Sequence, residues 1–113
     1  MNHPPEPSKV LLTVLNNVFE AEQKLKKAGD PTNIQRNLTK IKDAFEELGL
    51  FFEDPMGQKF VETRTDLEGS ISGTGTSNLV VVEVLKPIIR EGRREYSRVV
   101  QKGIVIFESK KED

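Results

Sequence analysis

With 113 residues, the chain has the length of one small domain, and its 35% apolar and 31% charged residues are typical of a soluble globular protein. A formal net charge of -1 excludes a general electrostatic attraction to nucleic acid or to an anionic membrane. The absence of cysteine excludes disulfides and thiol nucleophiles, and a single histidine, His3, excludes multi-histidine metal sites.

The first helix is predicted over residues 9–27, which contain neither glycine nor proline. Residues 1–8 are expected to form a disordered lead-in, because Pro4, Pro5 and Pro7 prevent regular structure there. Ser8 is the expected N-cap of the helix, and Gly29 is expected to end it. The helix has a wide apolar face that needs more than one neighbour. This face comprises the stripe Leu11, Leu15, Val18 and Leu25 and the adjoining stripe Val14, Val18, Ala21, Leu25 and Ala28.

A second helix is predicted up to Gly49, with Asp30 as N-cap and Pro31 at the first helical position. A connection of about three residues would pack the two helices as an antiparallel hairpin over residues 9–49. Because one hairpin cannot cover the wide apolar face, we expect two chains to form a four-helix bundle, which makes the protein a homodimer. The residues expected to carry dimerisation are Leu11, Leu15, Val18, Leu25, Ile34, Leu38, Ile41, Phe45 and Leu48.

Residues 50–108 are predicted to form a small all-β module, because short β-rich runs alternate there with glycine and proline turns. Pro87 is expected to place residues 86–90 at a sheet edge, and residues 91–93 are expected to form a turn. Residues 109–113 are expected to be a frayed, charged tail. The predicted fold is therefore α+β, a helical hairpin followed by this module. Its strands are expected at residues 50–52, 59–62, 66–72, 79–85 and 103–107.

The hydropathy of the chain predicts no membrane-spanning segment. No unbroken apolar run is longer than that of residues 79–82, which is far shorter than the roughly 20 residues that a bilayer requires. The first residues also lack the charged and apolar regions of a signal peptide. We therefore expect a cytoplasmic protein that does not bind membranes.

No set of residues in the sequence predicts catalysis. The carboxylates have no histidine or lysine partner at a spacing typical of general acid–base or metal chemistry. The stretch Gly73-Thr74-Gly75-Thr76 lacks the Gly-Lys-Ser/Thr ending of a phosphate-binding loop, and no helix is predicted after it. We expect no enzymatic activity, no cofactor and no metal.

Charge is divided unevenly within the predicted β-module. Residues 86–102 hold six cations against two carboxylates, whereas residues 51–70 hold five carboxylates against two cations. Ion pairing within the chain is one interpretation, and a protein-docking surface anchored by arginine is another. A nucleic-acid-binding strip from Lys86 to Lys102 is less favoured, because Tyr96 is the only nearby aromatic that could stack on a base.

Several short motifs, in a consistent order over residues 10–107, resemble the GrpE family of nucleotide exchange factors. The segment LLTVLNN at residues 11–17 looks like the family's LLPVLDN, and FEELG at 45–49 looks like the end of its second bundle helix. In the predicted β-module, GQKF at 57–60 resembles the family's G-x-x-F, and VEVLKP at 82–87 resembles its V-x-x-V-x-(Q/R)-(K/P)-G. The Gly92-Arg93 pair resembles the family's G-R turn, and residues 104–106 resemble its V-x-V strand. The chain departs from the family where residues 60–67 lack the proline and histidine of F-D-P-x-x-H-E-A. Only ten residues precede LLTVLNN in this sequence, so the family's long stalk helix is not expected in it.

The resemblance implies a non-catalytic co-chaperone that promotes ADP release from a DnaK-type ATPase. In the GrpE family the β-module presses against a lobe of the ATPase's nucleotide-binding domain. The matching partner-binding positions, together with cations near them, are Lys86, Arg90, Gly92, Arg93, Arg98 and Ile106. Arg93 is the first candidate; its alternative role is an ion pair with Glu91 or Glu95. The alternative function is a structural or adaptor dimer, with or without a specialised ATPase partner.

Overall fold

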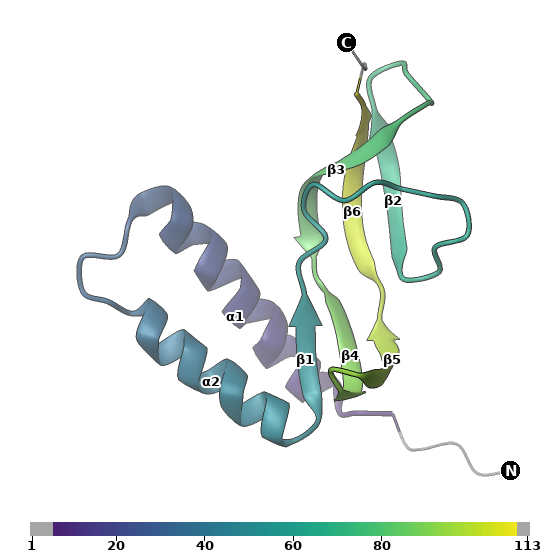
Figure 1. Ribbon diagram of the computed structural model, residues 1–113. Coiled ribbons are helices and arrows are strands. Elements are labelled where there is room, and N and C mark those ends of the chain that lie inside the picture. The colour runs from purple at the N-terminus through teal and green to yellow at the C-terminus, as the bar shows by residue number, and fades with distance from the viewer. Residues whose placement is uncertain (1–5, 111–113) are drawn as a thin grey trace, which may run out of the picture.

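A computed structural model describes residues 6–110 and has two helices followed by two three-stranded sheets (Figure 1). This architecture confirms the α+β class. Residues 1–5 of the predicted lead-in and residues 111–113 of the predicted tail lie outside the described residues. The elements are α1 (Lys9–Ala28), α2 (Gln35–Glu47), β1 (Leu50–Glu53), β2 (Leu67–Ser72), β3 (Leu79–Lys86), β4 (Ile88–Arg93), β5 (Tyr96–Gln101) and β6 (Gly103–Ser109).

Both predicted ends of α1 are confirmed. The Ser8 side chain accepts a hydrogen bond from the backbone N–H of Val10 at 3.2 Å, which satisfies one of the free amide groups at the helix start. At the other end, Gly29 has φ of 83° and its N–H donates to the carbonyl of Leu25 at 2.8 Å. A residue with a side chain would be strained at this positive φ, which explains why the helix ends at a glycine.

The predicted start of α2 is wrong by several residues. Residues 31–34 form a turn, and the helix begins at Gln35, with Ile34 as its N-cap. Asp30 still caps the helix, because its two carboxylate oxygens accept the N–H groups of Ile34 and Gln35, each at 2.7 Å. Asn33, with φ of 58°, breaks the helical path between the cap and the helix. Pro31 therefore belongs to a capping turn, and the connection between the helices is longer than predicted.

A buried polar group links α1 to α2. Glu22 is only 8% exposed, and its carboxylate contacts Lys42 Nζ at 2.7 Å and accepts a hydrogen bond from Gln35 Nε2 at 2.5 Å. The Lys42 ammonium also lies 5.5 Å from the ring centroid of Phe52 in β1. Phe52 in turn makes an edge-to-face contact with Phe19 of α1. These contacts fix both helices against the first strand of the β-module.

The first sheet has the strand order β1-β4-β5, and both pairings are antiparallel. The prediction that Pro87 places residues 86–90 at an edge is wrong, because β4 is the central strand and both Ile88 and Ile89 are 0% exposed. Pro87 lies between β3 and β4 and belongs to neither strand. Proline has no backbone N–H, and at this position neither strand loses a hydrogen bond because of it. The predicted turn at residues 91–93 is also wrong: these residues extend β4, and the turn follows at Arg94 and Glu95. Strand β5 was not predicted.

The second sheet has the order β2-β6-β3, with β6 parallel to β2 and antiparallel to β3. The strands predicted at residues 66–72, 79–85 and 103–107 are confirmed with small changes of boundary. The strand predicted at 59–62 is wrong, because only Lys59 forms an isolated bridge, with Val80. This segment instead covers the outer edge of β3, where Phe60 N–H donates to the Leu79 carbonyl at 2.9 Å.

Two apolar clusters hold the chain together. One lies within the β-module and is built from Leu67, Val81, Ile88, Val105 and Phe107. The other joins α1 to the first sheet through Leu15, Leu50 and Ile89, with Leu11, Leu12, Phe45, Phe52 and Val100 packed against them. A reciprocal amide pair adds to this junction: the side chains of Asn16 in α1 and Gln101 in β5 donate to each other at 2.9 Å. The base of the helical part is therefore fixed to the sheet that carries the β4–β5 hairpin.

Candidate functional site

The β4–β5 hairpin carries four of the six predicted partner-binding residues, Arg90, Gly92, Arg93 and Arg98. Arg93 pairs directly with Tyr96 in the register of the hairpin, and Glu91 pairs with Arg98. Gly92 is required here, because a Cβ atom at this position would lie 2.5 Å from the carbonyl oxygen of Tyr96. Its φ of 132° would also strain any residue with a side chain. The hairpin therefore holds Arg93 and Tyr96 side by side at its outer end.

Arg98 is held within the chain. Its guanidinium contacts Glu91 Oε1 at 2.8 Å and Glu6 Oε1 at 3.1 Å. The hydrogen bond to Glu91, followed by that to Glu6, raises the pKa of Arg98 above its usual value. Arg98 is thus ion-paired on the surface of the hairpin, and through Glu6 it also connects the segment before α1 to β5.

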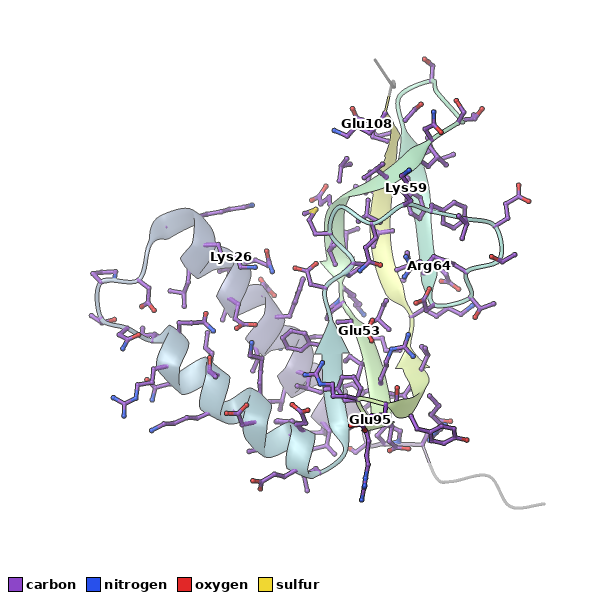
Figure 2. The ribbon with its side chains drawn as sticks, viewed as in Figure 1. Lys26, Glu53, Lys59, Arg64, Glu95 and Glu108 are labelled. Atoms are coloured by element: carbon purple, nitrogen blue, oxygen red, sulfur yellow. The ribbon has the colours of Figure 1, made fainter. Side chains whose placement is uncertain are left out.

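Arg94, in the turn, links the hairpin to α2. Its Nε donates to Glu46 Oε1 at 3.0 Å, and the guanidinium lies 4.3 Å from the ring centroid of Phe51. The hydrogen bond from Arg94 lowers the pKa of Glu46 below its usual value. Figure 2 shows Glu95, the other turn residue, at the end of the β-module where α2 meets β1. The helical part and the hairpin tip are therefore connected directly.

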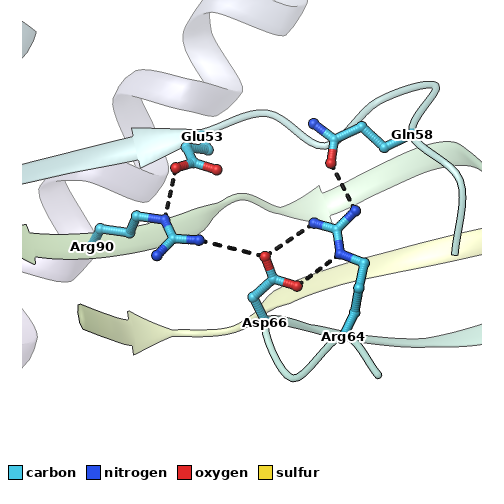
Figure 3. A network of polar contacts seen from close by, with 5 residues as sticks. All are labelled: Glu53, Gln58, Arg64, Asp66 and Arg90. Carbon is cyan, nitrogen blue, oxygen red and sulfur yellow. Dashed lines mark hydrogen bonds and ion pairs between the residues drawn. The ribbon is translucent and has the colours of Figure 1, made fainter. Parts of the chain in front are cut away.

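Arg90 belongs to a polar network at the junction of the two sheets (Figure 3). Arg90 Nε lies 2.7 Å from Glu53 Oε1 as an ion pair, although this buried nitrogen makes no well-aligned hydrogen bond. Its Nη2 lies 3.5 Å from Asp66 Oδ2. Arg64 binds the same Asp66 carboxylate through two nitrogens, at 2.9 and 3.0 Å, and donates to Gln58 at 2.8 Å. Arg90 consequently holds the β-module together and is not available for docking in this arrangement.

The network predicts an acid-sensitive contribution to stability. Arg64, chiefly through its hydrogen bonds, holds the pKa of Asp66 below its usual value. In the unfolded chain, Asp66 binds a proton near the ordinary aspartate pKa of about 3.9. The stabilisation by the charged Asp66 is therefore complete above that pH. It is lost as the pH falls through the lower pKa of the folded state. We expect the free energy of unfolding of the wild type to fall between about pH 5 and pH 2 more steeply than that of Asp66→Asn.

Denaturant unfolding at a series of pH values measures this difference. Asp66→Asn should already be less stable at neutral pH, because it loses the charge that binds Arg64. Glu62→Gln, at an exposed position nearby, should keep the pH dependence of the wild type. Equal acid slopes for the wild type and Asp66→Asn would show that the network does not stabilise the charged form.

The first interpretation of the charge division, ion pairing within the chain, applies to most of the cations over residues 86–102. Arg90, Arg94, Arg98 and Lys102 all make ion pairs, the last with Glu68 at 3.3 Å. Ion pairing within the chain is therefore confirmed for these four cations. Arg93 differs: it is exposed, and within residues 6–110 its side chain makes no ion pair or hydrogen bond. The alternative contacts of Arg93 with Glu91 or Glu95 are not formed.

The other two predicted partner-binding residues lie on the second sheet. Lys86 is exposed at the end of β3, whereas Ile106 is half-buried in the central strand β6. In the sheet register Lys86 is opposite Ile104, and Ile106 is opposite Glu83. The six residues are therefore not one cluster. Gly92, Arg93 and Arg98 lie together on the hairpin, whereas Arg90 of the same hairpin is bound at the sheet junction. Lys86 and Ile106 occupy the second sheet.

The predicted dimerisation residues divide into two sets. Leu15, Val18 and Leu38 are buried within the single chain, Leu11 and Phe45 pack against its core, and Leu25 is half-buried. Ile34, Ile41 and Leu48 remain 48%, 39% and 69% exposed. These three residues, spaced by seven, form one apolar stripe along α2 and its two ends. On α1, Val10 and Val14 are also exposed.

Tyr96 is the surface residue that sequence reasoning undervalued. It is 88% exposed, beside a hollow on the hairpin that is described below. Residues 96–101 contain an aromatic residue and two adjacent valines, and they lie between the Arg94-Glu95 turn and Gly103, which was a weak signal for a strand. A second cavity, of about 160 Å³, lies between α2 and β1 and is lined by residues including Lys42, Phe51 and Arg94.

Within residues 6–110, no group of three or more histidine, aspartate or glutamate side chains is placed to hold a metal ion. None of the helices in this part of the chain is long and apolar enough to cross a membrane. Comparison with protein-family models, with curated proteins and with solved structures finds no match. The geometry of the exposed surfaces is therefore the basis for a functional proposal.

Proposed function

We propose that this chain is a GrpE-like nucleotide exchange factor, a non-catalytic cytoplasmic co-chaperone that binds a DnaK-type ATPase and promotes ADP release. The observation that carries the proposal is the state of the hairpin cations. Arg94 and Arg98 are neutralised within the chain, whereas Arg93 is exposed on the hairpin without a partner among the described residues. An exposed guanidinium that is not neutralised among the described residues suits bidentate binding of a carboxylate on a protein surface.

The mechanism we propose involves binding alone. A protein that binds the open, nucleotide-free state of its partner more tightly than the closed state shifts the equilibrium towards the open state. Nucleotide then leaves faster without any covalent step. Lys86 and Ile106 on the second sheet would extend the contact beyond the hairpin, while Arg90 and Arg98 would support it from within.

We further propose that α1 and α2 act as an antiparallel hairpin and form half of a dimeric four-helix bundle. Supporting this is the exposed stripe of Ile34, Ile41 and Leu48, which leaves apolar side chains in contact with water in the single chain. Val10 and Val14 on α1 add to the apolar surface available to a second copy. The buried members of the predicted set would stabilise each chain internally.

Stopped-flow release of a fluorescent ADP analogue from a DnaK-type ATPase of the same source tests the exchange function. We expect the protein to accelerate release by about tenfold or more. Arg93→Ala should weaken binding by roughly 1–3 kcal/mol while leaving the thermal midpoint unchanged, because this side chain makes no contact that holds the fold. Arg36→Ala, which removes an exposed cation of α2, is the matched control and should behave as the wild type.

If release is unchanged with every DnaK-type ATPase of that source, the exchange function is refuted. The second candidate, a structural or adaptor dimer, is favoured by the same apolar stripe on α2 and predicts this outcome together with a stable dimer. Nucleic-acid binding is not supported, since ion pairs within the chain occupy Arg90, Arg94, Arg98 and Lys102.

A further inference from the structure

A shallow hollow of about 380 Å³ lies on the β4–β5 hairpin. The exposed ring of Tyr96 forms one side of it, next to Arg93 on the paired strand. The hollow is large enough to receive an aliphatic side chain from another molecule. The residues that line it are Glu91, Gly92, Tyr96, Ser97 and Arg98.

Two parts of this hollow, the backbone at Gly92 and the side chain of Arg98, are held by contacts within the chain. At Gly92 the two strands approach so closely that a Cβ atom would lie 2.9 Å from the Cα of Ser97. Arg98 is held by carboxylates on two sides, Glu91 at 2.8 Å and Glu6 at 3.1 Å. A surface that is already ordered loses little conformational entropy on binding, which favours affinity.

The charges beside the hollow indicate what kind of partner fits. Among the charged side chains of the hairpin, only Arg93 and Glu95 are without an ion pair among the described residues, and they have opposite signs. A polyanion such as nucleic acid would be attracted by one and repelled by the other. A folded protein can offer a carboxylate to the first and a cation to the second. Tyrosine and arginine are also the residue types most enriched at the energetic centres of protein interfaces.

We propose that Tyr96 is the anchor of the partner-binding surface. In the bound complex, an aliphatic side chain of the partner enters the hollow against the Tyr96 ring, and a neighbouring carboxylate of the partner binds Arg93. This inference rests on the proposed function, in which the partner is the nucleotide-binding domain of a DnaK-type ATPase. It adds a residue and a binding chemistry that the motif resemblance does not contain.

Titration calorimetry with that nucleotide-binding domain tests the proposal. Tyr96→Ala should weaken binding by about tenfold to a hundredfold, because it removes the ring that covers the partner's side chain. Tyr96→Phe should remain within about twofold of the wild type, since it keeps the ring. Val61→Ala, another exposed apolar position of the β-module, is the control and should bind as the wild type.

A second measurement does not depend on a substitution. Tyr96 is the only tyrosine, so a chain labelled with fluorotyrosine gives one fluorine resonance, which should shift when the ATPase domain binds. An unchanged resonance in the complex, or wild-type affinity for Tyr96→Ala, would overturn the anchor while leaving the exchange function intact. Absence of any binding by the wild type would overturn both. Binding of a single-stranded oligonucleotide that is lost in Tyr96→Ala would assign the surface to nucleic acid and overturn the proposal.

Discussion

Replacing Lys42 by methionine is expected to lower the free energy of unfolding by about 2–4 kcal/mol. The Glu22 side chain is 10% exposed and that of Lys42 is 34% exposed, so water is largely excluded from the carboxylate of their 2.7 Å ion pair but reaches part of the lysine. Without the ammonium, Glu22 retains only the hydrogen bond from Gln35 in a site that excludes most solvent. Methionine keeps an apolar contact with Phe52, so the main loss is the charge. Denaturant unfolding monitored by circular dichroism measures the change.

The double variant Glu22→Leu with Lys42→Met provides the decisive control. It removes both charges and replaces them with apolar groups, so it should recover most of the stability lost in the single variant. Lys40→Met, at an exposed position on the same helix, should change stability by less than about 0.5 kcal/mol. Equal losses in the single and double variants would mean that the carboxylate does not need its lysine.

Placing lysines on the α2 stripe is expected to convert the proposed dimer into monomers. Ile41→Lys with Leu48→Lys puts two like charges where two copies would bury apolar side chains, and we expect the dimer dissociation constant to rise by at least about a hundredfold. Both positions are exposed in the single chain, so its fold should survive. Lysine also suits the C-terminal end of a helix, where Leu48 lies. Sedimentation velocity over a range of concentrations measures the effect.

The matched control adds the same charge elsewhere. Thr63→Lys with Thr74→Lys lies on exposed loops of the β-module and should leave the oligomeric state unchanged. Substitutions such as Leu15→Asp are less informative, because Leu15 is fully buried within one chain and its loss would unfold the protein. A wild-type chain that remains monomeric at all accessible concentrations would contradict the bundle.

Signals confined to a few neighbouring residues were sufficient to predict several elements. The boundaries of α1 follow from Ser8 and Gly29, whose roles depend on the adjacent backbone alone. Asp30 was recognised as a cap, but its carboxylate reaches across a turn whose shape depends on the positive φ of Asn33. The spacing of residues in the sequence therefore could not predict where α2 begins.

The sheet order depends on contacts between distant residues. A proline such as Pro87 can mark either an edge strand or a break between two strands, and the local sequence is the same in both cases. Here the two cases are distinguished by the packing of Ile88 and Ile89 into separate apolar clusters. The candidate site shows the same limit. The excess of cations over residues 86–102 was visible in the sequence, whereas their partners Glu46 and Glu6 lie far away along the chain.

The parallel pairing of β2 with β6 has a consequence for synthesis on the ribosome. Strand β6 is central in the second sheet, so β2 and β3 both leave the ribosome before the strand that joins them. The first sheet can pair once β5 has emerged, while the apolar strand β3 still lacks its partner. Until β6 follows, the nascent chain exposes an unpaired strand of the kind that general chaperones bind. Among the described strands, β6 is the one that completes the second sheet and closes the core around Val81 and Val105.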